Sequence, residues 1–374
     1  MNKTDMKILL IGEYSNMHAT LAESLRRLGQ QVEVMSDGDG WRNYRRDIDI
    51  TRRDSSSKID GIRLICKLLW LLPRLHGFDV VQVINPKFLP LKARYSRWLL
   101  RYLRRANRSI SLGCYGMDSI VLRRQNEGCL EYSDTFCFGR KVNEANWMNL
   151  SGSWLDDEET KTTEEAAQSA DCLMACLYEY YINYNLPQYR AKLHYIAQPI
   201  VIDHTAKPKQ ITFPVKVLVG IQKKRIVEKG IDQMLPLLER LATAHPDKIQ
   251  LTKVENVPFD QYCHLLAETD VLADQLYSYT PAMNALEAMK HGTVVISGGE
   301  EDYYRFIGED RLRPVINLRP FDDDANYLML ERTLLDIDKM RSLSAESIAF
   351  VKKHHDSMIV AQQYLDIFAR IARF

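Results

Sequence analysis

The sequence predicts an α/β protein with two doubly wound domains that face a cleft. Short apolar runs alternate with amphipathic stretches along most of the chain, which is typical of parallel strands connected by helices. Two such series are separated by a polar segment at residues 200–212, and 374 residues suffice for two domains of ordinary size. Ligands of such sheets bind beyond the carboxyl ends of the strands.

The first series of strands and helices runs to about residue 200. A strand is expected over 7–11, followed by an amphipathic helix that Gly29 ends. Further strands are expected over 32–35, 78–84, 109–113, 170–175 and 193–197. The polar stretch 42–60 and the acidic segment 156–165 are expected to be loops.

The second series starts near residue 212. Its strands are expected over 215–221, 249–254, 270–273 and 293–296, and its helices over 230–245, 262–267 and 283–291. A C-terminal apolar stripe that ends at Phe374 predicts an amphipathic helix. We therefore expect an N-terminal domain at 1–200, a second domain at 201–355, and a terminal helix at 356–374 that packs back on the N-terminal domain.

Composition excludes several classes of protein. Lys and Arg number 50 against 49 Asp and Glu, so any phosphate must be bound by a local cluster of cations. The most apolar stretch, Leu64 to Leu75, is too short for a membrane span, which needs about 20 residues. The N-terminal apolar run is too short for a secretion signal. Seven cysteines without a Cys-x-x-Cys pair indicate free thiols in a reducing compartment, so we expect a cytoplasmic protein without a zinc site.

Two segments of the second series carry candidate binding residues. Residues 223–225 and Lys229 place four cations within seven residues, after a strand and before a helix, which suits a diphosphate. Glu287 lies at the start of an otherwise apolar helix, where its carboxylate could accept hydrogen bonds from the hydroxyls of a ligand. A solvated turn and a capping or surface glutamate are the alternatives.

Together, Gly220 to Asp232 and Leu286-Glu287-Ala288-Met289 resemble the C-terminal half of the GT-B glycosyltransferases of the large retaining group called family 4. The stretch 255–275 and the first β-α-β unit, over 11–32, are also similar to that group. The resemblance implies two Rossmann-like domains, a nucleotide-sugar donor and a glycan or lipid-linked acceptor. It further implies hexosyl transfer with retention, no required metal or cofactor, and a role in surface polysaccharide synthesis.

The resemblance also assigns residues of the donor site. Lys229 matches the lysine that binds the donor diphosphate, and Lys223 or Arg225 matches its partner arginine. Glu287 matches the second glutamate of the Glu-x7-Glu motif, which contacts the ribose. Tyr279 stands where the first glutamate is expected, so the sugar would be held differently, for example by backbone amides of residues 278–283, or activity would be weak.

The N-terminal domain is expected to hold the acceptor. Gly12, Ser15 and Asn16 belong to the loop after the first strand, and Ser15 or Asn16 could cap the following helix. His18 could donate a hydrogen bond to substrate or have a structural role. Asp118 lies in a loop that resembles the family loop carrying a catalytic His or Asp, and a turn aspartate is the alternative.

A basic helix is expected within residues 87–108, where eight cations occur without an acid. Its arginines are Arg94, Arg97, Arg101, Arg104, Arg105 and Arg108. Near an anionic membrane each cation contributes about 1 kcal/mol, which favours peripheral binding at the inner face of the membrane. A solvated face is the alternative. Nucleic acid is not expected, because no nucleic-acid-binding module accompanies the cluster.

Two other functions remain compatible with the sequence. Nucleotide-sugar 2-epimerases share this fold, although they need more carboxylates and histidines in the cleft than the sequence offers. A GT-B protein that binds a partner or a glycan without turnover is the non-enzymatic alternative. The missing first glutamate motivates this second alternative.

Overall fold

The computed structural model describes residues 5–255, 257 and 259–372, which fall into two compact units. Unit 1 comprises the chain up to Glu127, Met148–Pro199 and the residues from Ser357 onward. Unit 2 comprises Gly128–Trp147 and Ile200–Asp356. The segment Gly128–Trp147 thus belongs to unit 2, although the predicted N-terminal domain included it. Phe374, the end of the predicted apolar stripe, lies outside the described residues.

Unit 1 is built on a parallel sheet that has seven strands within the described residues, in the order β3-β2-β1-β4-β5-β8-β9. The strands are β1 (Lys7–Ile11), β2 (Gln31–Ser36), β3 (Ile48–Asp49), β4 (Val80–Val83), β5 (Ser109–Cys114), β8 (Cys172–Ala175) and β9 (Leu193–Tyr195). Those in the middle of the sheet are buried at nearly every position, because helices cover both faces. The direction in which strands are added reverses between β1 and β4.

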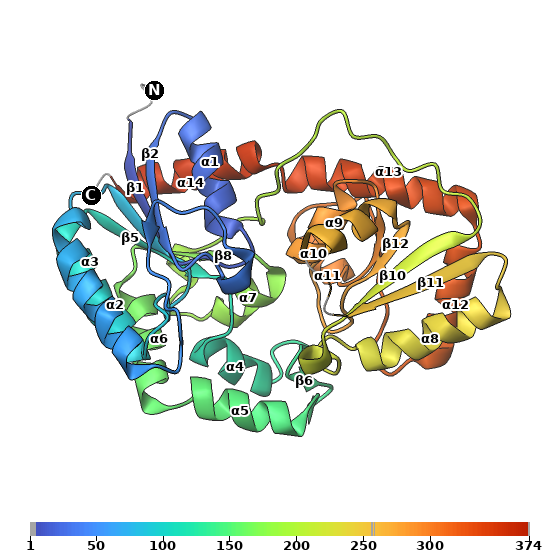
Figure 1. The fold of residues 1–374 in the computed structure, drawn as a ribbon, viewed down its shortest axis with the longest axis horizontal. Coiled ribbons are helices and arrows are strands. Elements are labelled where there is room, and N and C mark those ends of the chain that lie inside the picture. The colour runs from blue at the N-terminus through green and yellow to red at the C-terminus, as the bar shows by residue number, and fades with distance from the viewer. Residues whose placement is uncertain (1–4, 256, 258, 373–374) are drawn as a thin grey trace. The chain divides into compact units, whose positions relative to one another are not determined.

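Helices cover the two faces of this sheet (Figure 1). On one face α1 (Met17–Arg27) packs against α14 (Ser357–Ile371), and on the other lie α2 (Lys58–Leu71), α3 (Ala93–Ala106) and α6 (Asp157–Ser169). Helix α14 buries Tyr364 and Phe368 in the core of unit 1, and Ser109 Oγ donates to the Ile371 carbonyl at 2.8 Å. The other helices are α4 (Ser119–Asn126), α5 (Glu144–Trp154) and α7 (Tyr178–Tyr184), with 3₁₀ turns η1 (Gly40–Arg42), η2 (Leu72–Arg74) and η3 (Arg190–Lys192).

Unit 2 contains a smaller parallel sheet, with five strands among the described residues in the order β11-β10-β12-β13-β14. The strands are β10 (Val215–Ile221), β11 (Ile249–Glu255), β12 (Val271–Ala273), β13 (Val294–Ile296) and β14 (Val315–Ile316). The helical elements are η4 (Lys223–Arg225), α8 (Ile231–Ala244), α9 (Phe259–Glu268), α10 (Met283–Met289), α11 (Glu301–Phe306), α12 (Asp323–Leu334) and α13 (Ile337–His354). A short antiparallel pair joins β6 (Phe136–Cys137) to β7 (Arg140–Lys141).

The predicted fold class is confirmed, because both units are doubly wound parallel sheets. Two loop predictions are wrong. The acidic segment 156–165 is mostly helix α6, which Asp156 begins by accepting the Glu159 N–H at 2.8 Å. The stretch 42–60 contains β3 and the first turn of α2. No helix within the described residues is both long and apolar enough to cross a bilayer.

Candidate functional site

The carboxyl ends of β10 and β12 form the point of unit 2 where the strand order reverses. Lys229 follows β10 and Asp274 follows β12, and Lys229 Nζ lies 3.2 Å from Asp274 Oδ1. The Lys229 side chain is 13% exposed and that of Asp274 only 1% exposed. A buried carboxylate needs a partner charge and further hydrogen bonds, so this pair fixes the lysine ammonium at the edge of the sheet.

The backbone holds this lysine in place. Gly230 has a φ of +68° and precedes α8, and a Cβ at this position would lie 2.4 Å from Leu276 Cβ. The Leu276 N–H donates to the Lys229 carbonyl at 2.8 Å. The loops after β10 and β12 are therefore joined directly, and only glycine fits at position 230 without displacing Leu276.

Asp274 has other partners besides the lysine. Asn284 Nδ2 donates to Asp274 Oδ1 at 2.9 Å, and Tyr262 Oη donates to Asn284 Oδ1 at 3.0 Å. Asp274, Asn284 and Tyr262 were not predicted as residues of the donor site. Their positions, after a strand or on a helix, only weakly indicate a role in the site. The hydrogen bonds between them depend on which strands are neighbours in the sheet, which the sequence does not specify.

The three cations before Lys229 differ in their surroundings. They form the 3₁₀ turn η4 and are exposed. Lys223 Nζ pairs with Glu255 at 2.6 Å, which links the ends of β10 and β11. Among the described residues Arg225 has no ion-pair partner, so its guanidinium remains available for an anion.

Glu287 lies on α10, and its carboxylate is 2.5 Å from Lys290 Nζ, one turn along the same helix. This is the contact of a surface glutamate, and the side chain is partly exposed. Its contact with a ribose stays a prediction.

Tyr279 is buried beneath Gly128–Trp147, the segment of unit 2 that comes from the first half of the chain. Its ring stacks on Tyr132 with the centroids 4.7 Å apart, and its hydroxyl accepts the Glu131 N–H at 3.1 Å. Tyr132 donates to Glu300, which also accepts from Asn317 Nδ2 at 2.7 Å. Tyr279 therefore anchors the segment Gly128–Trp147 where the family motif has a glutamate.

In unit 1 the loop after β1 is held by buried groups. Gly12 has a φ of +89°, and a Cβ there would lie 2.2 Å from Ile84 Cγ2. The Glu13 carboxylate accepts the N–H groups of His18 at 3.2 Å and Ala19 at 2.8 Å, and so caps α1. Burial raises the pKa of Glu13 to about 7. Glu13 was missed as a capping residue because it lies well before the helix.

His18 is fully buried in α1. Its Nδ1 is 2.8 Å from the Gly12 carbonyl and its Nε2 is 3.1 Å from Gln82 Nε2. Burial lowers the pKa of His18 to about 4, so the ring is neutral at pH 7, with Nδ1 donating to Gly12 and Nε2 accepting from Gln82. These contacts match the structural alternative for His18.

Asp118 is likewise fully buried, as the N-cap of α4. Its Oδ1 accepts the N–H groups of Ile120 and Val121, both at 2.9 Å, and its Oδ2 accepts the Tyr184 hydroxyl at 2.7 Å. Burial raises its pKa to about 6. Both oxygens are therefore engaged within the core, as expected for the turn-aspartate alternative.

Ser15 and Asn16 lie in the left-handed region, with φ values of 51° and 68°. The prediction that one of their side chains caps α1 is wrong: Asn16 occupies the N-cap position without a side-chain hydrogen bond. The Ser15 N–H instead donates to Asp39 at 2.9 Å, joining the loops after β1 and β2.

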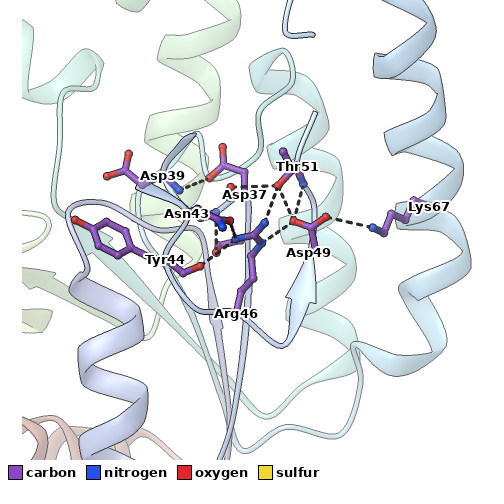
Figure 2. A network of polar contacts seen from close by, with 10 residues as sticks. Asp37, Asp39, Asn43, Tyr44, Arg46, Asp49, Thr51 and Lys67 are labelled. Carbon is purple, nitrogen blue, oxygen red and sulfur yellow. Dashed lines mark hydrogen bonds and ion pairs between the residues drawn. The ribbon is translucent and has the colours of Figure 1, made fainter. Parts of the chain in front are cut away.

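Arg46 makes several contacts within the loop after β2 (Figure 2). The Arg46 guanidinium donates to Asp49 Oδ1 at 2.6 Å, Asn43 Oδ1 at 2.8 Å and the Tyr44 carbonyl at 3.0 Å. Asp49 also lies 3.9 Å from Lys67 of α2. The predicted long loop is thus tied to itself and to the neighbouring helix.

The arginines of α3 lie beside the acidic helix α6 (Figure 1). Arg97 pairs with Glu158 at 3.3 Å and Arg101 with Glu165 at 2.5 Å, both on α6. Arg104 pairs with Asp171, and Arg108, just after α3, lies 3.6 Å from Asp79. The Arg94 guanidinium lies over the Tyr95 ring, and Arg105 is exposed. Acidic side chains therefore neutralise most of the positive charge that was predicted to face lipid. This could not be predicted from the basic segment itself, because the acidic partners lie on other elements.

Solved structures with the same fold include glycosyltransferases. Sucrose-phosphate synthase from Thermosynechococcus elongatus is 15% identical, covering 97% of this chain and 98% of its own, with a TM-score of 0.63. HepE of Anabaena in complex with UDP-glucose is 13% identical over 98% and 100% of the chains, with a TM-score of 0.54. The lipopolysaccharide outer core galactosyltransferase WaaB is 12% identical over 98% and 100%, with a TM-score of 0.54.

No protein-family model matches this sequence, and the search of curated proteins found no match. At these identities the structural comparisons show the fold alone. That fold is GT-B, as the resemblance implied.

Proposed function

We propose that this protein is a glycosyltransferase that moves a sugar from a nucleotide-sugar donor to a glycan or lipid-linked acceptor. The observation that carries the proposal is the fixed lysine Lys229 at the strand-order reversal of unit 2, next to the exposed cations of η4. Ligands of doubly wound sheets bind at such a reversal. The comparison with HepE, which was solved with UDP-glucose, supports a uridine nucleotide as the first donor to test.

The proposed chemistry is electrostatic. An ammonium has three N–H groups, so Lys229 can keep one hydrogen bond to Asp274 and offer the others to diphosphate oxygens. Arg225 is a candidate for a second, bidentate contact because its guanidinium is exposed. Positive charge positioned before the reaction stabilises the leaving diphosphate as negative charge develops on it, and the proposal assigns that role to these side chains.

The finer features of the reaction are proposed from the resemblance. They are hexosyl transfer, retention at the anomeric carbon, and a role in polysaccharide synthesis at the cytoplasmic face of the membrane. Because Tyr279 is packed under Tyr132, we assign no contact with the sugar to the Tyr279 side chain. The sugar would instead be bound by backbone amides of residues 278–283. His18 and Asp118 are proposed to shape the acceptor loop rather than to react, since their polar atoms are engaged. The anomeric configuration of the first product, read by proton NMR, tests retention.

The central test is removal of the Lys229 charge. We expect Lys229→Met to lower kcat/KM for the nucleotide-sugar donor about 100-fold, which corresponds to about 2.7 kcal/mol of lost transition-state stabilisation. Lys253→Met is the matched control, because Lys253 also pairs with an acid of unit 2, Glu239 at 2.7 Å, but lies on β11. Turnover should be followed with a panel of nucleotide sugars that begins with UDP-glucose.

Loss of Lys229 also leaves the buried Asp274 without its counter-charge, so activity must be separated from stability. The double variant Lys229→Met/Asp274→Asn removes that uncompensated charge and should recover stability without recovering activity. Full activity of Lys229→Met would remove this residue from the donor site. Failure of the wild-type protein to bind any nucleotide, measured by calorimetry, would favour the non-catalytic alternative.

A further inference from the structure

The segment Gly128–Trp147 contacts several loops at the carboxyl edge of the unit 2 sheet. Tyr132 donates to Glu300, in the loop after β13, and its ring stacks on Tyr279, in the loop after β12. A third contact of the segment reaches the loop after β10, which carries Lys229. The segment therefore reaches the edge of the sheet at which the proposed donor site lies.

The third contact joins Asn143 to Glu228. Asn143 Nδ2 donates to Glu228 Oε1 at 3.0 Å, although 85 positions separate the two residues in the sequence. Glu228 is only 8% exposed, whereas the three cations of η4 that precede it are exposed. A buried carboxylate needs hydrogen bonds in place of water. Asn143 supplies one to a carboxylate that directly precedes the lysine of the proposed donor site.

The Asn143 side chain also caps a helix. Its Oδ1 accepts the Asn146 N–H at 3.2 Å, at the start of α5. An amide carries one acceptor oxygen and one donor nitrogen, and Asn143 uses the oxygen for the helix and the nitrogen for Glu228. An aspartate could cap the helix equally well but could not donate to Glu228. The contact with Glu228 therefore requires an amide, and the helix alone does not.

Lys229 lies in a turn between η4 and α8 that two other parts of unit 2 hold. From the loop after β12, the Leu276 N–H donates to the Lys229 carbonyl at 2.8 Å, and Asp274 pairs with the Lys229 ammonium. From the segment Gly128–Trp147, Asn143 binds the same turn through Glu228. Because Glu228 and Lys229 are consecutive, loss of the second contact would loosen the lysine as well.

The contact with Asn143 also affects the charge around Lys229. A Glu228 carboxylate released from Asn143 would attract the neighbouring ammonium and repel the oxygens of a diphosphate. Asn143 binds this carboxylate with an uncharged donor. The N–H groups of Lys229 that Asp274 does not use thus stay available for a ligand.

We propose that Asn143 is a positioning residue of the donor site, which holds the Glu228 carboxylate and thereby keeps Lys229 in place for a diphosphate. The inference rests on the proposed function and adds to it a residue that does not touch the donor. It gives the segment Gly128–Trp147 a part in nucleotide binding through one hydrogen bond.

Reversal of this hydrogen bond tests the inference. Asn143→Asp keeps the cap of α5 but places a second carboxylate against Glu228, so we expect binding of UDP, measured by calorimetry, to weaken at least tenfold. Asn143→Asp/Glu228→Gln has the net charge of the wild type and a hydrogen bond of opposite direction. It should restore the affinity to within twofold of the wild type, which a merely structural role of Asn143 does not predict.

Tyr132→Phe is the matched control, because it removes a different hydrogen bond of the same segment, the one to Glu300. It should leave the affinity for UDP unchanged. Asn143→Ser is a second variant that adds no charge, since serine also caps helices but is too short to reach Glu228. We expect it to weaken binding of UDP about threefold.

Hydrogen exchange provides a measurement without nucleotide. The N–H groups of Lys229, Gly230 and Ile231 donate to carbonyls of residues 225–227 within the turn. Their exchange should be at least tenfold faster in Asn143→Asp than in the wild type, and normal in Asn143→Asp/Glu228→Gln.

Two outcomes would overturn the inference and leave the proposed function standing. They are unchanged affinity for UDP in folded Asn143→Asp, and weakened affinity that Asn143→Asp/Glu228→Gln does not recover. A wild type that binds no nucleotide, while exchange at Lys229 still responds to Asn143→Asp, would instead contradict the proposed function. The control of Lys229 by Asn143 would then stand on the exchange data.

Discussion

The polar groups of unit 1 and unit 2 lie in similar places, just beyond parallel strands, but have opposite surroundings. Glu13, His18 and Asp118 in unit 1 are fully or almost fully buried, and protein atoms occupy their hydrogen-bonding positions. In unit 2 the ammonium of Lys229 is fixed by Asp274 but remains partly exposed, beside exposed cations. A polar residue after a strand therefore indicates a ligand site only when the fold leaves some of its hydrogen-bonding capacity unused.

The largest effect that would sharpen this comparison is expected for Asp118→Ala. The variant removes the N-cap of α4 and leaves the buried Tyr184 hydroxyl without its hydrogen-bond acceptor. We therefore expect the free energy of unfolding to fall by about 3–4 kcal/mol. Urea denaturation measures this loss. Asp336→Ala, which removes the more exposed cap of α13, is the control and should cost about 1 kcal/mol. A variant that folds with normal stability but loses turnover would instead give Asp118 a catalytic role.

The pH dependence of stability tests the burial of Glu13. Its folded pKa of about 7 lies above the ordinary 4.5, so the folded state binds the proton more tightly. Ionisation of Glu13 therefore lowers the stability of the wild type as pH rises from 4.5 to 7, by about 3 kcal/mol. Relative to the wild type, Glu13→Gln should gain that amount of unfolding free energy over the same range. A constant difference between the two proteins would show that Glu13 titrates normally.

The smallest effects are expected at the cations of unit 2. Arg225→Gln should weaken binding of a nucleoside diphosphate about tenfold, because its guanidinium has no ion-pair partner among the described residues. Lys223→Gln should weaken it about twofold, because Lys223 is paired with Glu255. Calorimetry with UDP compares the two variants. The opposite order would mean that Lys223 leaves Glu255 when the ligand binds.

Much of the fold could be predicted from the sequence because the central strands are buried on both faces. Continuous apolar runs such as Val215–Ile221 leave little choice of element, and the predicted bounds agree with β10. Helix α6 could not be predicted in the same way, since it is acidic and its partners on α3 are remote in the chain. The place of residues 128–147 in unit 2 likewise depends on contacts that are remote in the sequence, such as those of Tyr132 with Tyr279 and of Asn143 with Glu228.

The candidate site could be predicted only in part for the same reason. Lys229 could be singled out because its cationic neighbours and following helix are local features of the sequence. Its pairing with Asp274 requires β10 and β12 to be neighbours in the sheet, which local patterns do not specify. The buried contacts of His18 and Asp118 likewise involve Gln82 and Tyr184, which come from other strands and helices.

The inserted segment Gly128–Trp147 determines how this protein can be divided. A fragment cut at residues 200 and 356 would lack Tyr132 and Asn143, and with them the cover of Tyr279 and the amide that donates to Glu228 at 3.0 Å. In such a fragment the Tyr279 ring would be exposed to water, and we expect the fragment to self-associate. Isolation of unit 2 for study therefore requires residues 128–147 to be joined to it through a designed connection.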